Sequence, residues 1–185
     1  MVDGVHAACM QHLILREAAQ YGVTIGSYFE PVNEGAIRVE ARGAHLTPVG
    51  RALALLASHR GRTRLRLPAA LERTGLDALA SRDAAGGILL TLANRDPSRA
   101  AAVRLALPAG AVARGVLLAG APLDVAFGAR RLSLAPDRRG GAVLRLPPFA
   151  VAGIEMAGHG EVTARANGGR KEGGAKRGRE RCLAG

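Results

Sequence analysis

The sequence has almost no aromatic side chains. Aromatic residues make up 3% of the 185 positions and tryptophan is absent, although apolar residues reach 48%. A core must therefore be built from alanine, leucine and valine, and each of the smaller of these side chains buries little area. No aromatic residues alternate with the arginines, so the chain offers no stacking platform for single-stranded nucleic acid, and we expect no nucleic-acid partner.

Cysteine sites and membrane spans are missing as well. The two cysteines, Cys9 and Cys182, stand at opposite ends of the chain with no Cys/His cluster, which argues against a disulfide scaffold and against a zinc site. No apolar run approaches the roughly 18 residues that a membrane helix needs, and no signal-peptide pattern is present. We expect no metal, no cofactor and no membrane contact, and a cytoplasmic location is favoured.

The formal charge of +11 raises the possibility of a polyanionic partner. Residues 158–185 hold seven basic and three acidic residues, are rich in glycine and show no periodicity. They predict a disordered basic tail.

Residues 1–60 predict the order helix, strand, loop, helix. The run VTIGSYF predicts a strand buried on both faces. Before it, an amphipathic helix over 4–21 that ends at Gly22 is favoured by the three-to-four spacing of one stripe of residues, namely Val5, Ala8, Cys9, His12, Leu13, Leu15 and Ala19. Thr47 followed by Pro48 is an N-cap signal for a helix over 48–59. One strand cannot bury the faces of two helices, so this segment is not a complete domain.

Residues 61–157 change to short apolar runs separated by turn residues at intervals of about 8 to 12 positions. We predict seven or eight strands between Thr63 and Met156, arranged as an antiparallel β-sandwich. The glycines of DAAGGI and DRRGGA predict hairpin turns rather than phosphate-binding loops, because a strand and not a helix follows each. The fold class is therefore mainly β, preceded by an incomplete α/β segment and followed by the tail.

The motifs EPVNEG, LTPVGRALALLASHRG, LTLANRD and LRLPPFAVAGIEM, in this order, resemble the carboxyl-terminal part of barrel-fold glycoside hydrolases of the arabinofuranosidase and xylosidase type. The resemblance implies that residues 4–21 correspond to the seventh barrel helix, 23–30 to the eighth strand and 48–59 to the eighth helix. It implies carbohydrate as the substrate of a full-length parent. It also places the acid/base and the nucleophile on the fourth and seventh barrel strands, so we expect no turnover by this chain alone.

The stretch YFEPVNEG carries the candidate site residues Glu30, Asn33 and Glu34. In an extended chain the two glutamates lie about 13 Å apart, farther than the roughly 5 to 9.5 Å between the paired carboxyl groups of glycosidases. A helical turn would bring them closer, but Pro31 disfavours one. The resemblance implies a substrate-contacting role in the eighth strand-to-helix loop. The alternative is a pair of solvated loop carboxylates, with Arg38 or Arg42 as candidate ion-pair partners.

Other polar residues have structural interpretations. His45 is interpreted as a loop residue and His59 as a helix C-terminal residue, while His6, Cys9 and His12 share one helix without a partner cluster. The alternative function is a non-catalytic β-sandwich interaction module whose basic tail binds polyanions. Exposed apolar faces on residues 1–60, with self-association through them, would favour the barrel remnant over that module.

Overall fold

The computed structural model describes residues 2–22, 32–33, 35–68, 71, 76–107, 109–120 and 127–157. Within this part the protein is mainly β, with antiparallel sheets and two helices. The elements in chain order are α1 (Val2–Tyr21), β1 (Ile37–Glu40), β2 (Gly43–Leu46), α2 (Pro48–Ala57), β3 (Thr63–Leu65), β4 (Leu76–Arg82), β5 (Ile88–Asn94), β6 (Ala101–Ala106), β7 (Ala113–Gly120), β8 (Phe127–Leu134), β9 (Gly141–Leu146) and β10 (Ala150–Met156). The predicted strand at 23–30 and the tail at 158–185 lie outside the described residues.

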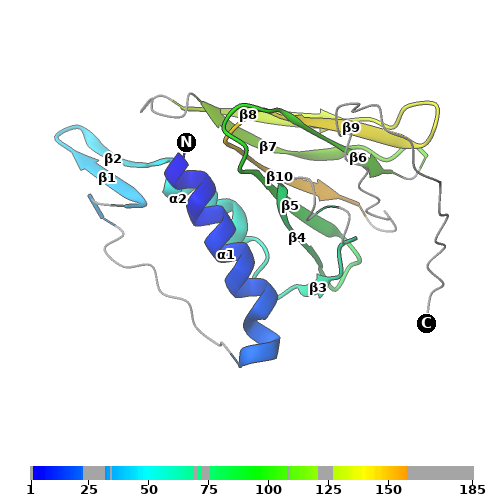
Figure 1. Cartoon of the computed structure of the whole chain (residues 1–185), viewed down its shortest axis with the longest axis horizontal. Helices are drawn as coiled ribbons and strands as arrows, with labels where there is room; N and C mark the ends of the chain where they lie inside the picture. The colour runs from blue at the N-terminus through cyan, green and yellow to red at the C-terminus, as the bar shows by residue number, and fades with distance from the viewer. Residues whose placement is uncertain are drawn as a thin grey trace, which may run out of the picture.

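A six-stranded antiparallel sheet with the order β3-β4-β5-β10-β7-β8 organises the fold. The strands β6 and β9 form a separate two-stranded sheet, and β1 and β2 form a hairpin. Figure 1 shows the two helices beside β4 and β5, with the hairpin projecting from the helices away from the large sheet. The prediction of seven or eight strands between residues 63 and 156 is confirmed, since β3 to β10 lie there.

The two faces of the large sheet bury different partners. Alternate side chains of a strand point to opposite faces, so Leu90 and Leu92 of β5 join one core cluster while Ala93 joins another. The first cluster includes Val103 of β6 and Leu144 of β9, and is formed by apolar side chains. The β6-β9 sheet therefore covers one face.

The helices cover part of the other face. Val5 of α1 and Leu56 of α2 pack against Leu118 of β7 and Val151 of β10 in the second cluster. The predicted cap of α2 is confirmed: the Thr47 hydroxyl accepts a hydrogen bond from the Gly50 amide at 3.2 Å, and Pro48 opens the helix. All seven residues of β5 are buried because both faces of this strand are covered.

Asn94, in the sequence LANRD, is a buried hydrogen-bonding residue at the end of β5. Its side chain is 1% exposed, and its Nδ2 donates to the carbonyls of Arg99 at 2.9 Å and Pro147 at 2.8 Å. Its Oδ1 accepts from the Asp96 amide at 3.1 Å. Asn94 thus ties the end of β5 to the turn after it and to the end of β9, which belongs to the other sheet.

Three predictions about local structure are corrected. The polar piece that includes Arg38, Glu40 and Arg42 forms the hairpin β1–β2, which the exposed, polar sequence did not reveal. The turn DRRGGA does not join paired strands, because β8 pairs with β7 whereas β9 pairs with β6. Leu13, placed on the buried stripe of the first helix, is 45% exposed.

Candidate functional site

Asn33 is the candidate site residue that the structure describes; Glu30 and Glu34 lie outside the described residues. Asn33 has a φ of 65°, in the left-handed region that asparagine tolerates. Its amide donates to the Ile37 carbonyl at 2.6 Å, and its Oδ1 accepts from the Val39 amide at 3.0 Å. The Asn33 side chain therefore shapes the entry into β1, while a substrate-contacting role stays a prediction.

A buried polar cluster lies where the helices meet the large sheet. His12 of α1 and His59, just after α2, both place Nε2 at 2.8 Å from the Thr91 hydroxyl of β5. His59 Nδ1 lies 2.6 Å from the Ser81 hydroxyl of β4. His12 and Thr91 are 0% exposed and His59 is 5% exposed. This arrangement corrects one prediction, because His12 has hydrogen-bond partners outside its own helix. His59 lies at the end of α2, as predicted, and is buried there.

Asp77 and Arg16 extend the cluster towards solvent. Asp77 of β4 forms an ion pair with Arg16 of α1, and its Oδ2 lies 3.8 Å from His12 Nδ1. Burial alone would raise the pKa of Asp77, but the interactions of its carboxylate with His12 and Arg16 outweigh burial and lower this pKa to about 2. The carboxyl group is therefore ionised at neutral pH and holds α1 against β4.

The hydrogen bonds of the cluster restrict where its protons can lie. Burial, followed by the charges of His12 and Arg62, lowers the pKa of His59 to about 4, so this ring is neutral at pH 7 and carries one N–H. The Thr91 hydroxyl has one hydrogen, so it donates to one of the two imidazoles and accepts an N–H from the other.

Contacts at the two ends of the cluster complete it. The Ser81 hydroxyl lies 2.6 Å from His59 Nδ1. His12 Nδ1 lies 3.8 Å from the Asp77 carboxylate, beyond hydrogen-bond distance, and is buried without a hydrogen-bond partner among the described residues. The cluster links both helices to β4 and β5.

The order Asp77, His12, Thr91 has the residue types of an acid–base–nucleophile triad, but its geometry excludes that use in this chain. The Thr91 hydroxyl is fully buried and faces two imidazole nitrogens, so no substrate atom can reach it. We conclude that the cluster is structural. Sequence reasoning missed it because its hydrogen bonds join residues 79 and 32 positions apart. The one available signal was Thr91 within the apolar run ILLTLAN.

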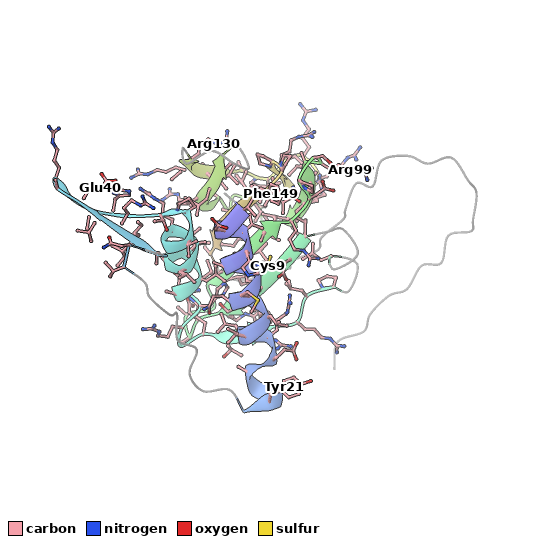
Figure 2. The ribbon with its side chains drawn as sticks, turned by 60° about the vertical axis from the view of Figure 1, so that its left-hand side comes forward. Cys9, Tyr21, Glu40, Arg99, Arg130 and Phe149 are labelled. Carbon is pink, nitrogen blue, oxygen red and sulfur yellow. The ribbon has the colours of Figure 1, made fainter. Side chains whose placement is uncertain are left out.

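The outer side of α1 exposes three large apolar side chains beside the polar residues Asp3 and His6. Met10 and Leu13 are each 45% exposed and Tyr21 is 68% exposed. Spacings of three and eleven residues place these side chains on one face of a helix. Figure 2 shows Tyr21 at the end of α1 that lies farthest from the strands. We refer to Met10, Leu13 and Tyr21 as the α1 stripe.

Among the described helices, none is long and apolar enough to span a membrane.

No protein-family model matches the chain, and no curated protein matches it. Solved structures do. An α-L-arabinofuranosidase of family GH51 from Thermotoga petrophila aligns over 82% of this chain with a TM-score of 0.64 and 19% identity. A family 51 α-L-arabinofuranosidase from Bifidobacterium longum aligns over 84% with a TM-score of 0.61 and 17% identity. The GH30 xylanase C from Talaromyces cellulolyticus aligns over 83% with a TM-score of 0.54 and 14% identity.

These likenesses show a glycoside hydrolase-like fold. The chain covers 37%, 34% and 34% of the three solved chains, so it spans about a third of their length.

Proposed function

We propose that this chain is the carboxyl-terminal piece of a glycoside hydrolase-like protein. In this proposal residues 61–157 form a β-sandwich, and residues 1–60 are the end of a (β/α)8 barrel whose other strands carry the catalytic carboxylates. The parent would cleave glycosidic bonds in polysaccharides, and this chain alone would have no turnover.

The α1 stripe is the observation that carries the proposal. Helices of a barrel pack between the barrel strands and neighbouring helices, and here the inner side of α1 packs on the large sheet while the outer side exposes Met10, Leu13 and Tyr21. Exposed apolar side chains grouped on one face indicate a missing partner. The coverage of about a third of the solved chains supports the same proposal.

The described part of the chain also supports the absence of turnover. Two of its strongly perturbed titratable groups, His59 and Asp77, belong to the buried cluster and are closed to substrate. Asn33 commits its side-chain oxygen to the Val39 amide. The sugar-cleaving groups would then come from the remainder of the barrel.

The test is to read the DNA upstream of Met1 in all frames and to express any extended chain. We expect an in-frame extension with barrel-like strands, and hydrolysis of p-nitrophenyl arabinofuranoside or xyloside by the extended chain only. In that chain, Glu34→Gln should raise KM more than it lowers kcat, because the glutamate would bind substrate. An extended chain without activity on any glycoside would overturn the proposal.

A second candidate is the non-catalytic interaction module. It is favoured by one observation: the inner sides of both helices are already covered by the large sheet, as in a self-contained unit. An absence of any upstream extension, together with a strictly monomeric chain, would support it. The basic segment 158–185 would then supply the polyanion contact.

A further inference from the structure

A groove of about 340 Å³ lies on the helix-covered side of the large sheet, beside α2. Leu55 and Ser58 form its α2 side, and β5, β7, β8 and β10 supply the other lining residues. The charged lining residues are Arg114 of β7, Arg131 of β8 and Glu155 of β10. None of these belongs to the buried cluster or to the α1 stripe.

Strand register explains why the three charges share the groove. Arg114 lies opposite Glu155, and Val116, two positions along β7, lies opposite Arg131. Opposed residues of antiparallel strands point to the same face. Two guanidinium groups and one carboxylate therefore stand on neighbouring strands on one side of the sheet.

Gly153 lets α2 pack close to the sheet beside the groove. It lies opposite Val116 in register, and the Leu55 side chain packs directly over it. A Cβ at Gly153 would lie 3.1 Å from Leu55 Cδ2, closer than most real contacts. Leu55, Leu89 and Val116 are the apolar side chains that line the groove on this side of the sheet.

The three charged side chains of the groove form no ion pair within the described part of the chain. No ion pair there joins Arg114, Arg131 or Glu155 to another side chain, although Arg114 and Glu155 are opposed in register. All three are exposed. The groove therefore presents both the planar donors that suit a carboxylate and an acceptor that suits hydroxyl groups.

We propose that this groove binds a hydroxylated carboxylic acid of the size of one sugar, that is, a uronic acid. Arg114 and Arg131 would receive the carboxylate, and Glu155 and Ser58 would bind ring hydroxyls. The C–H edges of the ring would lie on Leu55 and Val116. No aromatic ring takes part, so recognition depends on charge and hydrogen bonds rather than on stacking.

Two features of the groove favour this ligand over other anions. A simple carboxylate or a phosphate has too few hydroxyl donors to satisfy Glu155, and an acidic side chain of a protein would meet the same unpaired carboxylate. An extended peptide gains affinity by pairing its backbone with a sheet edge. This groove lies on a face of the sheet, over the interior strands β10 and β7, and takes Arg131 from the edge strand β8.

The binding proposal is tested on the chain alone. It can therefore fail while the proposed function stands, and the proposed function can fail while uronic acid binding stands. The amide resonances of Gly115 and Gly153 are followed by NMR during titration with glucuronate, glucose, propionate and a triglutamate peptide. We expect glucuronate to bind about tenfold or more tightly than each of the others, since two charged hydrogen-bonding groups are gained together. Equal binding of glucose or propionate, or tighter binding of the peptide, overturns the proposal.

Variants locate the site. Arg131→Gln and Arg114→Gln should each weaken glucuronate binding about tenfold. Arg145→Gln is the matched control, because Arg145 is an exposed arginine of β9 in the other sheet. Glu155→Gln should weaken glucuronate but not propionate, because only the former offers hydroxyl donors. An equal loss in the Arg145 variant would show non-specific charge attraction and would contradict the proposal.

Discussion

The two faces of the large sheet are built differently. The face towards β6 and β9 is closed by apolar side chains such as Leu90, Leu105 and Leu144. The face towards the helices combines apolar contacts with the hydrogen bonds of His12, His59 and Thr91, and leaves a charged groove uncovered. An apolar face can pack with any partner of the right shape. A hydrogen-bonded face specifies one position of the helices, and because it contains histidines its contribution to stability depends on pH.

The largest expected effect is on the apolar face. Leu90 is fully buried in β5 and faces the β6-β9 sheet. Leu90→Ala should lower the free energy of unfolding by about 4 kcal/mol through lost burial and a residual cavity. Urea unfolding at pH 7 and at pH 5 measures this loss. We expect the same loss at both pH values; a strong pH dependence would show that the two faces are coupled.

Acidification should act on the helix face. The unfolded pKa of His59 is 6.5 and the folded pKa is about 4, so the unfolded chain binds a proton first as the pH falls. The contribution of this ring is complete above pH 6.5 and is lost as the pH falls to 4, a loss of about 3 kcal/mol at most. Urea unfolding across this range measures the slope.

His59→Gln is the control for this slope. The variant should be less stable at pH 7, because the Ser81 and Thr91 hydroxyls lose their hydrogen bonds to the imidazole of His59. Its free energy of unfolding should change less between pH 6.5 and pH 4 than that of the unchanged chain. An unchanged slope would assign the pH dependence to other groups.

Thr91→Val gives the closest comparison with Leu90→Ala, since the two residues are neighbours on β5 and face opposite sides. Valine keeps the shape of threonine but removes the hydroxyl that serves both imidazoles. We expect a loss of about 2 kcal/mol in the free energy of unfolding, from buried nitrogens left without a partner. A neutral or stabilising effect would show that the cluster adds nothing to stability.

Cys9 provides the smallest expected effect. Burial, followed by the charge of Asp77, raises the pKa of its thiol to about 12. In a Cys182→Ser variant, alkylation of Cys9 by iodoacetamide at pH 8 should be slow in the folded chain, because the thiolate is the reactive form. The same variant in urea is the control and should react at the ordinary rate. Equal rates would contradict this packing of α1 on the sheet.

Much of the fold is readable from sequence. Alternating runs indicated β4 to β10, and Thr47 with Pro48 indicated the start of α2. The hairpin β1–β2 was missed because all but one of its eight residues are exposed and no alternation marks a buried side. The pairing of β9 with β6 was missed because turn residues show where a chain bends, not which strand it pairs with.

The site was less predictable than the fold. The prediction centred on Glu30, Asn33 and Glu34, of which the structure describes Asn33 alone. The buried cluster depends on long-range pairs such as His12 with Thr91, and a single histidine in a sequence carries no sign of its partner. The charges of the groove become neighbours only through strand register.

The most direct test of the proposed function is the self-association of the chain. Sedimentation velocity is measured over a range of concentrations for the unchanged chain and for Met10→Glu/Leu13→Glu. The matched control is Val143→Glu on β9, where the side chain is 46% exposed, against 45% for Met10 and for Leu13. We predict association that the double change abolishes and the control leaves intact. A monomer at all concentrations, or equal effects of both variants, would contradict the assignment of the α1 stripe as an interface.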